Sequence, residues 1–146
     1  MAIQGTWVPG ANPRATAQVE QIQQTGTTDG ITFGGKPVVL LTMLGRSGKV
    51  RKVPLMRVEH DGKYAVVASK GGAPPDHPQW YDNLVANPDL DLQDGTEIGS
   101  FRARELSGPE REVWWERCVS AYPPYLEYTA KTDRVFPVLL LEPVSD

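Results

Sequence analysis

The apolar run Val38–Met43 constrains the fold most, because a short apolar run of this kind is typical of a buried strand. A second strand is predicted over residues 49–59 and a third over residues 63–69. Asp61-Gly62 separates them, and Asp-Gly is a dipeptide that two-residue hairpin turns with positive φ prefer. The segment 36–69 is therefore predicted to form an antiparallel meander.

Helix signals lie on both sides of this segment. Asn12-Pro13 resembles an N-cap followed by a proline at the first helical position, which predicts a helix over residues 13–25 that ends at Gly26. After the meander, Asp76 and Gln79 have the spacing of a capping box, and Asn87-Pro88 stops the helix that they begin.

A longer helix is predicted further along the chain. Ser107 and Glu110 form a second capping-box pattern. The apolar seam of an amphipathic helix follows, interrupted by Pro123-Pro124, and its members are Trp114, Cys118, Ala121 and Tyr125.

Strands outnumber helices in the predicted order, and their connections are mostly short. Leu90 and Leu92 alternate with polar residues before a turn at Asp94-Gly95, and strands follow near residues 98–106 and 135–141. The expected fold is α+β, an antiparallel sheet curled into a small barrel with helices packed outside. We expect one domain over residues 1–146, with residues 1–30 as an N-terminal helical and loop extension.

Composition excludes several classes of function. The formal net charge of −3 argues against wholesale binding to nucleic acid or anionic membrane. The two histidines, His60 and His77, have no Cys or His at ligand spacing, so no metal site is expected. The N-terminus lacks a signal-peptide pattern, and no apolar window reaches transmembrane length. We expect a soluble cytoplasmic protein, with peripheral contact at the inner face of the membrane left open, as is its oligomeric state.

A local concentration of positive charge contrasts with the acidic whole. Four of the 15 Lys and Arg residues lie close to the Ser47-Gly48 pair, namely Arg46, Lys49, Arg51 and Lys52. Glycine lets a backbone approach an anion, and Arg can contact phosphate or carboxylate in a bidentate manner. The alternative is a solvated strand edge on which Lys discourages aggregation. Arg51 and Lys52 are expected on opposite faces of their strand.

Two further motifs follow the predicted third strand. Ser69-Lys70-Gly71-Gly72 lies where backbone amides can meet a polar ligand, but it matches neither a Walker P-loop nor G-x-G-x-x-G. The alternative interpretation of this motif is a plain turn between a strand and a helix that requires glycine. Trp80 and Asn83 lie one helical turn apart and could contact a ligand together. The alternative interpretation is that Trp80 packs in the core and Asn83 hydrogen-bonds to nearby backbone.

Three tyrosines surround the proline pair. Tyr122, Tyr125 and Tyr128 come at steps of three and could line a pocket with apolar walls and hydroxyl groups, although a core-packing stripe has the same spacing. Cys118 is expected to be a small buried hydrophobic residue. Since no catalytic triad, carboxylate pair or metal cluster is present in the sequence, an enzyme of this kind would depend on a bound cofactor.

The order and spacing of these motifs resemble the deazaflavin-dependent nitroreductase family of actinobacteria over about residues 30–143. The resemblance rests on Leu40–Leu55, Val66–Gly72, Pro78–Pro88, Tyr122–Tyr128 and Thr132–Arg134. It implies a split β-barrel of the flavin-reductase type. It also implies hydride transfer from reduced coenzyme F420, an 8-hydroxy-5-deazaflavin with a phosphate and an oligoglutamate tail. The implied substrates are activated double bonds of enones and coumarin-type lactones, quinones and nitroaromatics.

The resemblance also implies roles for single residues. Arg46, Arg51 and Lys70 would hold the phosphate and tail. The full implied cofactor-binding set is Arg46, Ser47, Lys49, Arg51, Pro54, Ser69, Lys70, Gly71, Gly72, Trp80 and Asn83, and the implied catalytic set is Ser69, Tyr122, Tyr125 and Tyr128. One departure affects the tail geometry: the family reads Gly-Arg-Lys-Ser/Thr-Gly, and this chain has Gly45-Arg46-Ser47-Gly48.

Three other functions remain open at this point. An enzyme of the same barrel class could use FMN, and a carrier could bind the deazaflavin or a lipid without turnover. A nucleic-acid-binding barrel could use the basic hairpin, although the acidic net charge counts against it.

Overall fold

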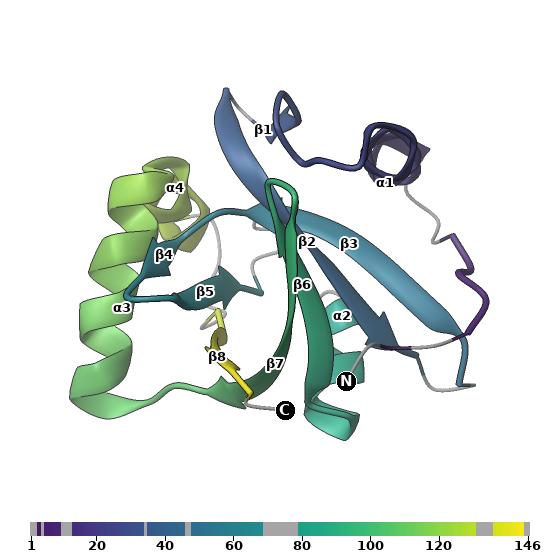
Figure 1. Ribbon diagram of the computed structural model, residues 1–146. Helices are drawn as coiled ribbons and strands as arrows, with labels where there is room; N and C mark the ends of the chain where they lie inside the picture. Colours follow the sequence, from purple (N-terminus) through teal and green to yellow (C-terminus); the bar gives the residue numbers. More distant parts are fainter. Residues whose placement is uncertain are drawn as a thin grey trace.

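The computed structural model describes residues 3, 5–9, 13–33, 35–45, 48–68, 79–130 and 136–144. An antiparallel sheet curls through the centre of the molecule, with α1 on one side and α3 and α4 on another (Figure 1). The elements are α1 Pro13–Thr25, β1 Thr32–Phe33, β2 Lys36–Leu44, β3 Val50–Met56, β4 Glu59–His60, β5 Lys63–Val67, α2 Gln79–Ala86, β6 Asp89–Asp94, β7 Glu97–Glu105, α3 Gly108–Ala121, α4 Pro124–Ala130 and β8 Val138–Pro143.

A bend between β3 and β4 closes the sheet into a barrel. Adjacent strands follow the order β1-β2-β6-β7-β8-β5-β4, and β3 pairs with Val38–Leu44 of β2. At the bend, the Arg57 amide still donates to Pro37 on the β2 side, at 3.1 Å, while the Val58 carbonyl already accepts from Ala65 of β5, at 3.0 Å. The β3–β4 segment therefore pairs first with β2 and then with β5, which confirms the α+β split β-barrel expected from the sequence.

The predicted meander over residues 36–69 was wrong in one respect. Its second strand, predicted over 49–59, is divided into β3, which pairs with β2, and β4, which pairs with β5. The antiparallel succession is therefore as predicted, and β6, β7 and β8 connect β2 to β5 on the other side of the barrel. The hairpin turn was predicted correctly: Asp61 and Gly62 have φ values of 53° and 78°, both in the left-handed region that this turn requires.

Both faces of β2 are buried, which explains its nearly continuous apolar sequence. Val39, Leu41 and Met43 belong to the interior cluster of the barrel. Val38 and Leu40 point the other way and pack under α1, which contributes Val19 and Ile22. In β8 the same alternation places Leu139 and Leu141 inside the barrel, and Val138 and Leu140 under α3. Strands buried on both faces lose the polar alternation that marks a half-exposed strand.

The helices agree with the predictions except at their ends. Residues 13–25 form α1 as expected, Gly26 follows with a φ of 77°, and Pro123-Pro124 separates α3 from α4. The capping box predicted at the start of α3 was wrong about the hydrogen bonds. Ser107 is the N-cap residue, but its side chain makes no hydrogen bond to the helix backbone. The Glu110 carboxylate instead accepts two hydrogen bonds from Arg104, at 2.8 and 2.7 Å, because a bidentate charged pair is stronger than a backbone cap.

Other boundaries differ from the predictions by a few residues. The last strand runs Val138–Pro143 rather than 135–141, because its pairing with β7 continues to Phe101 opposite Pro143. Residue 135 and the predicted cap at Asp76 lie outside the described residues. The strand predicted near 98–106 is β7, and Leu90 and Leu92 lie in β6.

A polar network holds the bend at the barrel end. Arg57 Nε donates to both carboxylate oxygens of Asp94, at 3.0 and 2.9 Å, and the Tyr64 hydroxyl donates to Oδ2 at 2.6 Å. Burial alone would raise the pKa of Asp94, but the hydrogen bonds from Arg57 and Tyr64 outweigh it and hold that pKa below 3.8. Burial and the same carboxylate raise the pKa of Tyr64. The network therefore ties β3, β5 and β6 together through one ionised carboxylate.

We predict that Asp94→Asn destabilises the fold by about 1–2 kcal/mol at neutral pH, because Arg57 loses its charged acceptor. The pKa of Asp94 is lowered in the fold, so its stabilising contribution is present above about pH 3.8 and is lost as pH falls through the folded value. Urea denaturation at pH 7 and pH 3 measures both effects.

Asp89→Asn is the matched control, because the Asp89–Arg102 ion pair lies at the surface. The side chains of Asp89 and Arg102 are 60% and 64% exposed. It should change the free energy of unfolding by less than about 0.5 kcal/mol. Equal effects of the two substitutions, or an Asp94→Asn effect that persists at low pH, would contradict the proposed role of the network.

Candidate functional site

The basic loop joins β2 to β3 and is closed by its own backbone. The Gly45 amide donates to the Lys49 carbonyl at 2.8 Å, and the Gly48 amide donates to the Gly45 carbonyl at 3.0 Å. Gly48 has a φ of 78°, a conformation that glycine adopts without strain. Lys49 is exposed beside this turn. Arg46 and Ser47 lie outside the described residues.

Arg51 and Lys52 project to opposite faces of β3, as predicted. Arg51 alternates with Val53 and Leu55, which pack against the barrel interior. Its Nη1 donates to the carbonyls of Val8 and Pro9 at 2.9 and 3.1 Å. Pro54 is half-buried in the same strand, opposite Leu40 of β2.

Lys52 lies on the outer face and belongs to a polar row that sequence reasoning missed. Its Nζ donates to Thr42 Oγ1 at 3.0 Å, and burial lowers the pKa of Lys52 against the opposing effect of Asp91. Asp91 lies opposite Thr42 in the register, and its Oδ2 accepts from the Ile3 amide at 2.7 Å. The alternation of Asp89, Asp91 and Gln93 with leucines was the signal for this row, but the strand register that aligns it is not a local feature.

Helix α2 places Trp80 and Asn83 against the barrel interior. Trp80 is 9% exposed and Asn83 is 3% exposed. Tyr81 anchors the helix to the end of β7, because its hydroxyl donates to Glu105 at 2.5 Å, which raises the pKa of Tyr81 to about 12. Asn83 Oδ1 is buried and has no hydrogen-bond partner among the described residues. Such an unpaired buried acceptor costs about 1–3 kcal/mol, so it suits a donor supplied by a ligand.

The glycine motif of residues 69–72 lies in the connection between β5 and α2. Ser69, Lys70, Gly71 and Gly72 are all outside the described residues, as is the rest of the connection up to residue 78. The last described residue before them, Ala68, is fully buried, and its amide donates to the Pro137 carbonyl at 2.9 Å. β5 itself ends at Val67, and the predicted role of the motif is not tested by the described residues.

Tyr122 and Tyr125 lie on a different face of the sheet from Trp80. Tyr122 and Tyr125 are 8% and 7% exposed and pack together edge to face, with ring centroids 5.0 Å apart. They belong to the cluster under α3 that includes Val67 and Val138, whereas Trp80 packs with Val66 and Leu139 inside the barrel. This packing agrees with the core-stripe alternative. The side chain of Tyr128, in α4, is outside the described residues, and the catalytic role of all three tyrosines stays a prediction.

Cys118 is fully buried in the same cluster, and burial raises the pKa of its thiol to about 12. The thiolate is the reactive form of cysteine, and it is therefore disfavoured here. The prediction that Cys118 is a small buried hydrophobic residue is confirmed.

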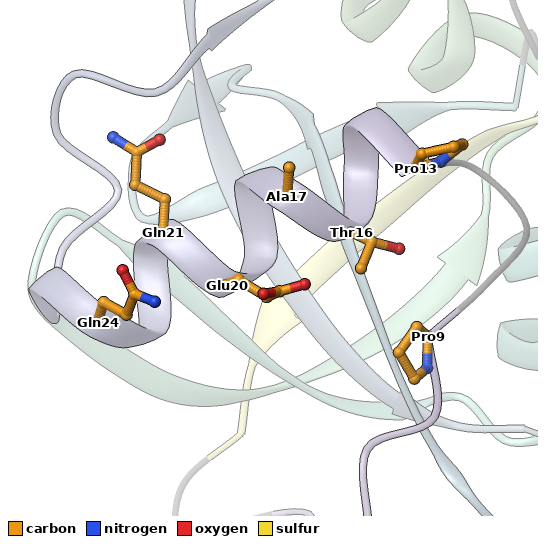
Figure 2. Close-up of a pocket in the computed structure, with 7 residues that line it drawn as sticks. All are labelled: Pro9, Pro13, Thr16, Ala17, Glu20, Gln21 and Gln24. Carbon is orange, nitrogen blue, oxygen red and sulfur yellow. The ribbon is translucent and has the colours of Figure 1, made fainter.

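An open groove lies along α1 (Figure 2). Side-chain amides, prolines and one carboxylate line it, from Pro9, Pro13, Thr16, Ala17, Glu20, Gln21 and Gln24. None of these described lining residues is cationic, and we assign the groove no role. In the described part of the chain, no group of three His, Cys, Asp or Glu residues could hold a metal ion. None of the described helices is long and apolar enough to span a membrane.

Comparisons with known proteins identify the class. The family described as F420H(2)-dependent quinone reductase matches residues 14–143. A Mycobacterium tuberculosis protein described as a candidate F420H(2)-dependent quinone reductase is 38% identical over 111 residues, covering 74% of this chain and 92% of its own length. A solved structure described as an F420-H2 dependent reductase is 56% identical, with a TM-score of 0.69, and covers 77% of this chain and 100% of its own.

Another solved structure, described as a domain-swapped dimer, is 55% identical, with a TM-score of 0.71, and covers 87% of this chain and 96% of its own. The fold and the family match together define a deazaflavin-dependent oxidoreductase on a split β-barrel. The chain belongs to the F420H(2)-dependent quinone reductase family, and its cofactor is reduced coenzyme F420.

The described side chains fit this cofactor. Coenzyme F420 carries a phosphate and carboxylates; the loop supplies exposed Lys49, and β3 supplies Arg51, whose Nε and Nη2 have no partner among the described residues. Its ring carries polar edges, and the buried Oδ1 of Asn83 offers an acceptor without a partner among the described residues. An anionic ligand with ring donors would satisfy both features.

We predict that Asn83→Ala leaves the melting temperature of the free protein within a few degrees, because the substitution removes an unpaired buried acceptor. If Asn83 contacts the coenzyme, the same substitution weakens coenzyme binding by about tenfold. Differential scanning fluorimetry and calorimetric titration measure the two effects. A large loss of stability with unchanged affinity would show that Asn83 serves the fold alone.

Proposed function

We propose that the protein transfers a hydride from reduced coenzyme F420 to hydrophobic, electron-poor substrates, with quinones as the first class. The family match over residues 14–143 carries this proposal. Relatives named as quinone reductases support the quinone class. Enones, unsaturated lactones of coumarin type and nitroaromatics are further proposed substrates, because they share an electron-poor carbon that accepts hydride.

Arg46, Arg51 and Lys70 would bind the phosphate and the oligoglutamate tail of the coenzyme. The supporting observation is that Arg51 makes no bond to a carboxylate among the described residues, although it lies beside the glycine turn. Ser47, Lys49 and Pro54 would complete the loop side of the site. Backbone groups of Ser69, Lys70, Gly71 and Gly72 would contact the ring, while Trp80 and Asn83 close one side from α2.

The bound coenzyme supplies the hydride, so the protein does not need a strong acid or base of its own. The chain must bind and orient an electron-poor carbon within a near-attack distance of roughly 3–3.5 Å and exclude water. Ser69 or a hydroxyl of Tyr122, Tyr125 or Tyr128 would donate to the substrate oxygen where negative charge develops. A tyrosine or water would supply the proton.

Two of the functions that the sequence alone left open predict different results in a binding experiment. An FMN-dependent reductase would bind FMN through the same barrel, and a carrier would bind the deazaflavin or a lipid without turnover. Calorimetric titration of the protein with coenzyme F420 and with FMN, followed by a quinone reduction assay, separates them. Binding of the deazaflavin with turnover supports the proposal, binding without turnover supports the carrier, and preferred binding of FMN supports the flavin enzyme.

Lys70→Ala and Arg51→Ala are each expected to raise the coenzyme Kd by about tenfold or more, because each removes a charge-assisted contact to the anionic tail. Calorimetric titration measures the Kd, and Lys36→Ala, at the exposed start of β2, is a matched control that should leave it unchanged. Unchanged affinity in both site variants would remove the anion site from the proposal.

Tyr125→Phe is expected to leave coenzyme affinity unchanged and to alter kcat or the choice among quinone, enone and nitroaromatic substrates, because it removes only a hydroxyl. Steady-state kinetics and a thermal melt make the test. A lower melting temperature with normal kinetics would instead assign Tyr125 to the packing that its ring contact with Tyr122 already provides.

A further inference from the structure

The segment Thr6–Pro9, here named the N-terminal strap, lies along the start of β3. The Val50 amide donates to the Thr6 carbonyl at 3.1 Å, and the Val8 amide donates to the Val50 carbonyl at 2.9 Å. Trp7 thus forms a parallel bridge with Val50, and its side chain packs against the cluster under α1. The strap is therefore fixed to the strand that begins just after the basic loop.

The strap also holds the guanidinium of Arg51 by one nitrogen. Nη1 donates to Val8 and Pro9, at 2.9 and 3.1 Å, and this uses two of the five donors of the group. Among the residues that the structure describes, Nε and Nη2 have no partner. These two nitrogens form one edge of the planar group, the kind of edge that contacts carboxylate or phosphate with two parallel bonds. The two bonds therefore fix Nη1 and leave the Nε–Nη2 edge available to a ligand.

The absence of a side chain at Gly45 leaves room for the Arg51 side chain in this position. A Cβ at residue 45 would lie 3.2 Å from Cγ of Arg51 and 3.6 Å from its Nε, so any side chain there would press on the stem. The free edge of the guanidinium therefore begins beside the loop of residues 45–49. Arg51 is half-buried: its Cγ lies close to Gly45, and its Nη1 bonds to the strap.

We propose that the N-terminal strap is a positioning element for the anionic tail of the coenzyme: by binding Nη1 of Arg51, it presents the Nε–Nη2 edge to a phosphate or carboxylate group. The inference rests on the proposed role of Arg51 in tail binding. A free arginine side chain must lose rotamer freedom on binding an anion, and the strap removes part of that cost before the coenzyme arrives. The strap is a support and does not itself contact the ring or the substrate.

Val8→Pro tests the strap, because proline removes the amide that donates to Val50 while the charge of the protein stays the same. Val8→Ala keeps that amide and is the matched control. Calorimetry is used to titrate each protein with coenzyme F420 and with the deazaflavin chromophore that lacks the phosphate and the glutamates. We expect Val8→Pro to raise the Kd for the coenzyme by about three- to tenfold, with no change for the chromophore or in Val8→Ala.

Amide exchange in the unaltered protein gives a second test that needs no substitution. Because coupling between two sites is reciprocal, coenzyme binding at Arg51 should slow exchange of the Val8 amide by a similar factor, and the tail-less chromophore should not. Faster exchange with the coenzyme, or tighter binding by Val8→Pro, would show that the strap obstructs the tail and would overturn the inference. So would an unchanged Kd in Val8→Pro together with unchanged exchange.

The outcomes also separate this inference from the proposed function. If the unaltered protein binds the coenzyme and Arg51→Ala weakens binding while Val8→Pro does not, the anion site stands and the strap has no role in it. If the unaltered protein does not bind the coenzyme, both proposals fail together.

Discussion

The burial of β2 on both faces and along both edges is the constraint on which the rest of the structure depends. Its edges bond to β3 and β6, one face forms the barrel interior, and the other lies under α1. A strand with no exposed side has one usable register, because a shift by one residue would exchange its two apolar sets. That register fixes where β2 ends, and so it fixes the basic loop and Arg51 at one end of the barrel.

Local signals predicted a large part of this fold, and long-range pairings account for what they missed. The Asp61-Gly62 turn, the break at Pro123-Pro124 and the bounds of α1 follow from residues that are neighbours in sequence. The insertion of β6 to β8 between β2 and β5 is decided by pairings across the whole chain. Glu110 shows the same limit on a smaller scale: its spacing from Ser107 indicated a cap, but Arg104 on a neighbouring strand is the better partner.

The candidate site was predictable in its residue types and less so in its arrangement. The sequence indicated that Arg51 and Lys52 would diverge, and the strand alternation produces this. It gave no indication that backbone carbonyls more than 40 residues earlier would hold Arg51. Among the described residues, Arg57, Arg102 and Arg104 each bond a carboxylate, whereas Arg51 and Arg111 donate to backbone carbonyls. Of these last two, Arg51 is the one that lies beside the loop.

The deep burial of Cys118 bears on chemical durability. Quinones and enones are electrophiles that add thiolates, so an enzyme that handles them risks being alkylated by its own substrates. The single cysteine of this chain lies in the packed layer under α3, with its pKa raised to about 12, and so presents almost no thiolate at neutral pH. Burial in the cluster that includes Trp114 thus keeps the single thiol of the protein out of contact with solvent, where such electrophiles would otherwise reach it.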